Sequence, residues 1–335
     1  LIPFLLLAGL LAACGASGPK TLKEGEKLRV IASTPHLASL AMAIAGDDAT
    51  VELLPSEGGN PHEYEPTIAD RRRLQEAHLL LVNGLSLEPF DAKKLAEAAG
   101  VRLVDCSAEI PASWLLGEDD EDNVHAHHDH EEEDDDEGHD HGAQNPHVWL
   151  SVEGALYQAE AITKAMGEID KAHAPNYASR LTKLESGLNS LRTEYQPKVS
   201  ALKHREFVSN HDAFPYFARE YGLEQVGVIQ RTPGSNPTVE ERREIESMLK
   251  EGGADAIFME PGFDDVASRA IAESSGLPLA TLDPFGVGKP APDALQVVLR
   301  KNLEAVLKTT RACTPARLRT RRPTPRPAQT QGPTQ

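Results

Sequence analysis

The amino-acid sequence predicts an α/β protein of two lobes, each with a central parallel four-stranded sheet and flanking helices, joined by one long rigid helix. In both halves of the chain, short apolar runs alternate with helical segments of about ten residues, which is typical of parallel sheets covered on both faces. One amphipathic pattern, sustained over about six turns, separates the halves. The 335 residues are enough for two domains of ordinary size.

The first half shows this alternation clearly. Runs rich in branched and apolar residues predict strands at 28–34, 50–54, 79–82 and 101–105. Helices are expected at 37–45, 67–77 and 90–99, the first ended by Gly46 and the second capped by Thr67. The segment 56–62 is rich in glycine and proline and predicts a loop after the second strand.

A long helical stretch follows. Ser151 caps a helix expected to end at Ile169, and residues 174–202 then repeat apolar side chains at alternating spacings of four and three. These positions are Tyr177, Leu181, Leu184, Leu188, Leu191 and Tyr195. Pro197 is expected to kink or loosen the far end. A single helix of this length between two α/β halves would be a rigid connection between them.

The second half repeats the pattern of the first. Strands are expected at 206–210, 225–230, 256–259 and 277–282. Helices are expected up to Tyr221, at 238–251, at 266–275 and at 293–307. Thr238 and Glu241 have the spacing of a capping box, which marks the start of the second of these helices.

These elements divide the chain into an N-terminal lobe at 27–172, a linking helix at 173–203 and a C-terminal lobe at 204–308. Residues 309–335 are rich in Thr, Arg, Pro and Gln, lack periodicity and are expected to be disordered. Residues 1–14 form a short apolar segment that ends in Leu-Ala-Ala-Cys. This ending resembles a lipobox, in which Cys14 is acylated and anchors the protein to a membrane surface. An ordinary cleaved signal peptide is the alternative.

An acidic, histidine-rich loop is expected at 118–144. Up to residue 141 it contains fourteen carboxylates and six histidines, which are His125, His127, His128, His130, His139 and His141. It has almost no apolar side chain to bury, so it is predicted to be a solvated, disordered loop. Imidazole and carboxylate are zinc ligands, so we interpret the loop as an auxiliary metal-collecting segment. A charged insert without any ligand is the alternative.

Composition excludes several classes of function. The formal net charge is −18, and no basic face is visible before the extreme C-terminus, so no nucleic acid is expected as a partner. The chain contains no GxSxG, no HExxH and no P-loop, so it is not expected to be an enzyme. Cys106 and Cys313 could pair outside the cytoplasm, but no disulfide between them is expected.

Four polar residues lie where a strand ends or a loop closes. They are His62, His147, His211 and Asp283. Ligands of open parallel sheets bind outside the carboxyl ends of the strands, and three imidazoles with one carboxylate form a complete tetrahedral set for Zn²⁺. Two of these residues come from each half, so the metal would lie between the lobes. Each residue also has an alternative role. His62 could be a turn histidine and His147 one more loop histidine, while His211 could cap the following helix and Asp283 could form a turn.

Residues near these four are assigned supporting roles. Glu260 is a candidate for orienting a histidine by accepting its second N–H, as partners of metal ligands commonly do. Tyr64 and Glu65 are expected to buttress the loop that carries His62. His36, at a helix start on the same side of the sheet, is expected to be structural.

Five motifs in order resemble the metal-specific solute-binding proteins of ABC transporters, in particular the zinc-uptake branch with its histidine-rich loop. They lie at 60–66, 145–149, 209–217, 258–261 and 281–285. The resemblance implies His62, His147 and His211 as ligands. It also implies Asp283 as the usual carboxylate ligand, although water or another carboxylate can take the fourth place in zinc-uptake members. The manganese branch typically has a carboxylate at the position of His211, so this histidine favours zinc.

The function that follows is high-affinity, extracytoplasmic binding of Zn²⁺ by a lipid-anchored protein that is expected to be a monomer. It would deliver the ion to the membrane permease of an ABC transporter for zinc uptake. Two alternatives stay open: a manganese or iron solute-binding protein, and a stand-alone periplasmic zinc buffer or adhesin without a permease.

Overall fold

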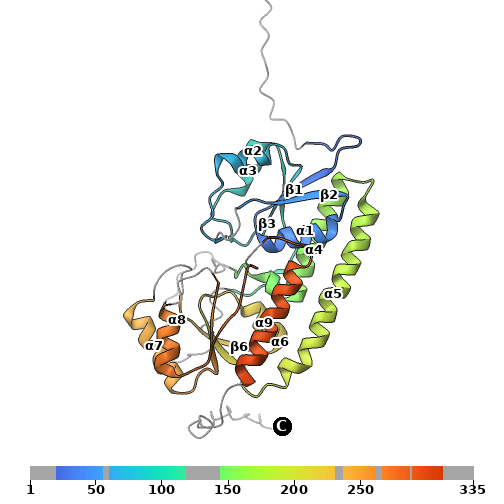
Figure 1. The fold of residues 1–335 in the computed structure, drawn as a ribbon. Helices are drawn as coiled ribbons and strands as arrows, with labels where there is room; N and C mark the ends of the chain where they lie inside the picture. The colour runs from blue at the N-terminus through green and yellow to red at the C-terminus, as the bar shows by residue number, and fades with distance from the viewer. Residues whose placement is uncertain are drawn as a thin grey trace, which may run out of the picture.

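The computed structural model describes residues 20–55, 60–117, 144–230, 237–261, 266–286 and 289–311. Two parallel sheets lie at opposite ends of an elongated molecule, with long helices running between them (Figure 1). Cys14, Cys313 and the six histidines of the acidic loop lie outside the described residues. The two-lobe α/β architecture with parallel four-stranded sheets is confirmed.

The N-terminal sheet is covered on both faces. Its strands are β1 (Leu28–Ala32), β2 (Ala49–Leu53), β3 (Leu79–Val82) and β4 (Arg102–Asp105), in the order β2-β1-β3-β4. Its helices are α1 (Pro35–Ala45), α2 (Ile68–Leu74) and α3 (Ala92–Ala99). Successive strand residues point to opposite faces, so Val30 packs with the core under α1, while Ile31 packs with the core under α2 and α3.

The C-terminal sheet has the same topology. Its strands are β5 (Glu206–Ser209), β6 (Glu224–Val228), β7 (Ala256–Met259) and β8 (Leu279–Thr281), in the order β6-β5-β7-β8. Its helices are α6 (Pro215–Tyr221), α7 (Val239–Lys250), α8 (Val266–Ser275) and α9 (Ala294–Arg311). Thr238 and Glu241 form the expected capping box at the start of α7, and Thr67 forms another with Asp70 at the start of α2.

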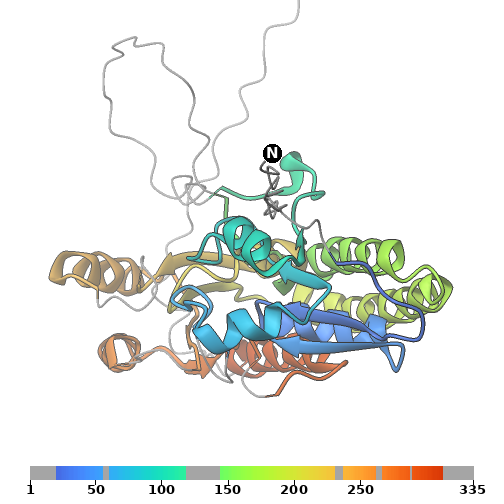
Figure 2. The same ribbon diagram turned by 90° about the horizontal axis from the view of Figure 1, so that it is seen from above.

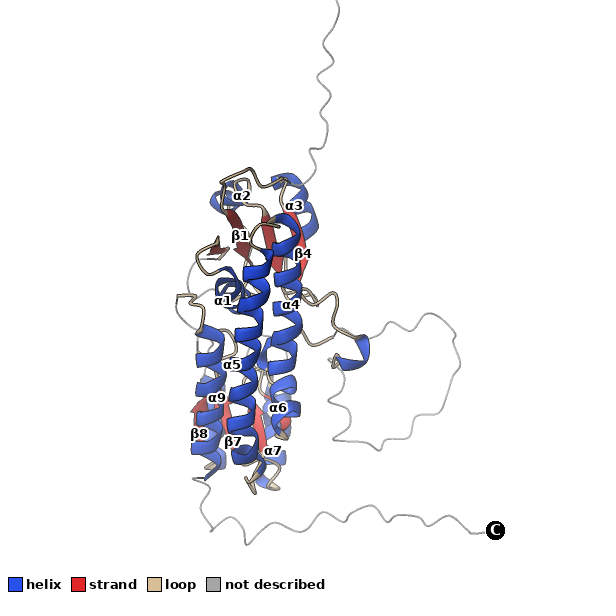
Figure 3. Ribbon diagram, turned by 90° about the vertical axis from the view of Figure 1, so that its right-hand side faces the viewer, coloured by secondary structure: helices blue, strands red, loops and turns tan. Residues whose placement is uncertain are grey.

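Three long helices connect the two ends of the molecule. Helices α4 (Val152–Ile169) and α5 (Ala174–Ser200) lie side by side, and α9 runs along α5 (Figures 2 and 3). Helix α5 buries the predicted apolar stripe, except that Leu181 is only partly buried, and it continues through Pro197 to Ser200. One hydrophobic core extends from Leu28 in β1 to Phe258 in β7, so the two sheets share a continuous apolar interior.

The C-terminal helix extends further than the sequence predicts. Helix α9 ends at Arg311, whereas the sequence places its end at residue 307 and a disordered tail from residue 309. The hydroxyl of Thr310 donates to the carbonyl of Val306 within the last turn, and both Thr309 and Thr310 are buried. Threonines can therefore continue a helix when packing buries them, which composition alone does not reveal.

Two short 3₁₀ helices, η1 (Ala112–Trp114) and η3 (Val148–Leu150), flank the gap left by residues 118–143. A backbone bridge between Gly117 and Gln144 brings the two sides of this gap together, so η3 and the residues just before it are held in the core. None of the helices within the described ranges combines the length and the apolar character that crossing a membrane requires.

Candidate metal centre

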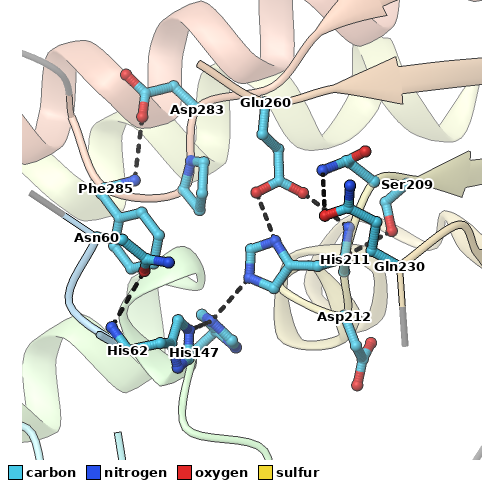
Figure 4. Close-up of polar contacts among 12 residues, drawn as sticks. Asn60, His62, His147, Ser209, His211, Asp212, Gln230, Glu260, Asp283 and Phe285 are labelled. Atoms are coloured by element: carbon cyan, nitrogen blue, oxygen red, sulfur yellow. Dashed lines mark hydrogen bonds and ion pairs between the residues drawn. The ribbon is translucent and has the colours of Figure 1, made fainter. Parts of the chain in front are cut away.

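Three histidines from distant parts of the chain converge between the two sheets (Figure 4). His62 follows β2, His147 immediately precedes η3, and His211 follows β5 by two residues. The carboxyl ends of parallel strands lie at one edge of a sheet, so the loops after β2 and β5 reach the same region from opposite lobes. The convergence expected for these three histidines is therefore present.

The spacing of the three imidazoles matches metal coordination. The Nε2 atom of His147 lies 3.2 Å from Nε2 of His62 and 3.3 Å from Nε2 of His211. All three ligand atoms lie within 4.8 Å of one another. Zn–N bonds of about 2.0–2.1 Å at tetrahedral angles separate two ligand nitrogens by about 3.3 Å. The distances from His147 to the other two ligands thus already suit a tetrahedral ion.

Hydrogen bonds at the far side of two rings fix which nitrogen faces the centre. Nδ1 of His147 lies 3.1 Å from Oδ1 of Asn145, whose Nδ2 donates to the backbone oxygen of Asp212. Nδ1 of His211 lies 2.5 Å from a carboxylate oxygen of Glu260. Both partners are acceptors, so each Nδ1 carries a proton and faces away from the centre. The Nε2 atoms are therefore the ring nitrogens that a metal ion would meet.

Burial disfavours the charged form of two of the imidazoles, His62 and His147. It lowers the pKa of His62 to about 4, and the neighbouring His211 lowers it further. Burial also holds the pKa of His147, which is 3% exposed, well below the usual range, with added effects from His211 and His62. Neutral imidazole is the form that binds metal, so at neutral pH these two ligands need lose no proton to take up an ion.

The structure does not bring Asp283 to the three histidines. Its Oδ1 accepts the backbone N–H groups of Phe285 at 3.0 Å and Gly286 at 2.8 Å, and Figure 4 shows the carboxylate turned toward this backbone. The group of potential ligands found among the described residues consists of the histidines alone. Asp283 thus has the turn-forming role, because an Asp-Pro sequence readily bonds to the backbone two residues on.

Glu260, Tyr64 and Glu65, the residues predicted to support the site, differ in whether they contact a histidine. Glu260 is 4% exposed and contacts His211 twice, because its second oxygen accepts the backbone N–H of His211 at 3.0 Å. The Tyr64 hydroxyl donates to Asp70 and anchors the segment after β2. Glu65 is exposed. Glu260 therefore orients His211 directly, whereas Tyr64 acts on His62 only through the fold of its loop.

Two other residues near the centre, Phe285 and Asn83, have no role predicted from the sequence. The Phe285 ring faces all three histidines, with centroids 6.0–6.4 Å away. His36 is buried and stacks on Trp149 at 3.8 Å, which supports its structural role. Asn83 donates to the carbonyl of Pro146, the residue before His147. The repeated Asn-Pro-His motif is one sequence signal that marks this neighbourhood, and the motif at 281–285 that contains Phe285 is another.

The family comparison agrees with this geometry. The family model described as the periplasmic component A of the zinc-uptake complex, ZnuA, matches residues 30–309. The chain belongs to the ZnuA family. The match includes both sheets, the long helices and the three histidines. This is a family of metal-uptake components rather than of enzymes, as the sequence predicts.

Individual relatives include proteins named for different metals. The zinc-binding protein AdcA of Streptococcus pyogenes is 29% identical over 297 residues, which are 87% of this chain and 57% of that protein. The chain thus spans little more than half the length of this relative. The manganese ABC transporter substrate-binding lipoprotein PsaA of Streptococcus pneumoniae is 26% identical, with 83% and 86% of the two chains covered.

Solved structures share the fold. A crystal structure of ZnuA is 26% identical, has a TM-score of 0.69 and is matched over 83% of this chain and 99% of that chain. The solute-binding protein FpvC of Pseudomonas aeruginosa in complex with Ni²⁺ is 23% identical, with a TM-score of 0.71 and coverage of 85% and 97%. The latter likeness is one of fold alone.

Proposed function

We propose that this protein is an extracytoplasmic solute-binding protein that binds Zn²⁺ with high affinity and delivers it to an ABC permease. The observation that carries the proposal is the convergence of one ligand nitrogen each from His62, His147 and His211 within 4.8 Å, with Nε2 of His147 at the spacing of tetrahedral ligands from Nε2 of the other two. Membership in the ZnuA family supports both the cargo and the transport partner.

The chemistry of the ligands supports zinc over manganese. Imidazole ligands suit Zn²⁺, Cu²⁺ or Ni²⁺, whereas Mn²⁺ prefers carboxylate and water oxygens. The carboxylate of Glu260 contacts Nδ1 of His211 and so acts behind the ring rather than at the ion. The resemblance to PsaA makes a manganese carrier the second candidate, and competition between the two metals decides between them.

The first prediction concerns the three histidines together. Replacing His62, His147 and His211 by alanine should abolish tight Zn²⁺ binding by the metal-stripped protein, because no other described group of residues offers a comparable site. Competition against a chromophoric chelator measures the affinity. The matched control is His173→Ala, which removes an imidazole that pairs with Asp170 on the outside of the molecule. Tight binding retained in the triple variant would refute the assignment.

The remaining parts of the proposal concern segments outside the described residues. The histidine-rich loop is proposed to gather Zn²⁺ near the site, so a chain lacking residues 118–141 should bind fewer ions and keep one tight site. Cys14 is proposed as the lipid attachment that holds the protein, as a monomer, on a membrane surface. Growth under zinc starvation, with and without the gene, separates a transport component from a stand-alone zinc buffer or adhesin.

A further inference from the structure

Three turns at the metal centre have the same local structure. They comprise residues 60–62, 145–147 and 283–285, each an Asn or Asp followed by proline and a ring-bearing residue. In each turn the side-chain oxygen of the first residue accepts the backbone N–H of the third, at 3.1, 3.0 and 3.0 Å respectively. Proline restricts the backbone and has no N–H of its own. The third residue is histidine in two turns and Phe285 in the last.

The Phe285 ring takes a position like that of a fourth ligand. Its centroid lies 6.0 Å from the ring of His62, 6.1 Å from that of His147 and 6.4 Å from that of His211. The three imidazole centroids lie 5.1–5.8 Å from one another. Phe285 is therefore nearly equidistant from all three and faces the group from one side (Figure 4). A phenyl ring has no lone pair to offer a metal.

The same turn directs the Asp283 carboxylate away from the centre. Oδ1 of Asp283 accepts the N–H groups of Phe285 and Gly286, so the turn that presents the phenyl ring also retains the carboxylate. A charge-assisted bond of this kind is stronger than one between neutral groups, so releasing the carboxylate is costly. Phe285 and Asp283 thus act together. The ring of Phe285 faces the three histidines, and the carboxylate of Asp283 is bonded to the backbone of the turn instead.

We propose that Phe285 is the selectivity-determining residue of the site, because its ring occupies the place of a fourth ligand and keeps Asp283 from the metal. The inference rests on the proposed function and specifies its metal preference. The protein then supplies three imidazole nitrogens and no coordinating carboxylate. Such a set holds Zn²⁺ well, whereas Mn²⁺, at the weak end of the divalent series and in need of oxygen ligands, is disfavoured. Selectivity comes from excluding the ligand that the competing ion requires.

The test measures Zn²⁺ and Mn²⁺ affinities of the full chain after metal removal, by competition with a chromophoric chelator. Phe285→Ala should raise the affinity for Mn²⁺ relative to Zn²⁺ by about tenfold or more, since water and the second oxygen of Asp283, Oδ2, can then approach while Oδ1 keeps the turn. Asp283→Asn alone should leave both affinities within about twofold, because the amide oxygen keeps the turn. Asp283→Asn added to Phe285→Ala should remove most of the gain.

Phe285→Leu is the matched control, because it keeps an apolar side chain of moderate size and should retain most of the preference for Zn²⁺. Circular dichroism of each variant verifies that it is folded. Two results would overturn the inference: a loss of about tenfold or more in Zn²⁺ affinity from Asp283→Asn alone, or an unchanged Zn²⁺ to Mn²⁺ ratio in folded Phe285→Ala. If the unaltered chain binds no Zn²⁺ tightly, the proposed function fails instead.

Discussion

At the scale of single residues, the metal centre depends on the groups that hold each imidazole. Asn145 bonds to both Nδ1 and the backbone N–H of His147, and its amide nitrogen reaches the backbone oxygen of Asp212, next to His211. One side chain therefore sets the tautomer of one histidine and links it to the segment that carries another. Such partners of metal ligands influence affinity although they never touch the ion.

Glu260→Gln tests this dependence at His211. The carboxylate receives two donors from His211, whereas an amide has one oxygen and must turn an NH₂ group toward one of them. We expect Zn²⁺ affinity to fall by about 10–100-fold, the usual effect of losing such a partner. The chelator competition described above measures it. The control is Glu63→Gln, on the exposed part of the His62 loop, and an equal loss in that variant would contradict the prediction.

At the scale of secondary structure elements, the start of α4 positions His147. The helix is capped by Ser151, whose side chain accepts the N–H of Gly154, and η3 occupies the three residues between His147 and this cap. Gly154 lies against η3 so closely that an added Cβ would be 2.1 Å from the carbonyl oxygen of Val148. The absence of a side chain there allows helix and turn to pack together directly behind the metal centre.

Gly154→Ala should therefore destabilise the protein, although alanine favours helices. The clash is with backbone that cannot move without displacing the His147 turn, so we expect a loss of roughly 1–3 kcal/mol in the free energy of unfolding and weaker Zn²⁺ binding. Urea denaturation measures the first effect and chelator competition the second. Gly167→Ala is the control on the same helix, where the nearest atom is the Ala174 side chain at 3.2 Å. Similar behaviour of the two variants would refute the argument.

At the scale of the whole molecule, both lobes and the long helices share one hydrophobic core. Apolar residues of β1, α5, β7 and α9 belong to the same buried cluster, so the sheets are not separate bodies joined by a flexible linker. The metal centre lies between these sheets with its imidazoles close together, His147 and His211 buried and His62 partly buried. Folding therefore places His62 and His147 where burial disfavours their protonation, and this couples the stability of the metal-free protein to pH.

The metal-free protein should lose stability on mild acidification. The pKa of His62 is about 4 in the folded protein and near 6.5 in the unfolded chain, so between these values the unfolded state binds more protons. The free energy of unfolding should thus be unaffected by His62 above pH 6.5 and decrease as pH falls from 6.5 to 4. His36, with a pKa of about 3, adds to the same trend.

Urea denaturation of chelator-treated protein at several values of pH between 4 and 7 measures this slope. His62→Ala should flatten it, because the substituted chain has lost a group that titrates differently in the two states. The exposed carboxylates of the surface titrate in both proteins alike, so the comparison isolates the imidazole. An unchanged slope in His62→Ala would contradict the prediction.

The sequence by itself determined the alternation of strands and helices, the long amphipathic helix and three of the residues that converge at the metal centre. Hydrophobic periodicity and capping signals are local, and they specified α8, β3 and β7 to the residue. The sequence did not show where α9 ends. Thr309 and Thr310 are helical because distant elements bury them, and composition does not reveal that burial. Only the tertiary structure decided which polar residues face the site. Asp283 and Phe285 lie two residues apart, and the hydrogen bonds of one turn, which spacing along the chain does not specify, turn the carboxylate away and the ring toward the histidines.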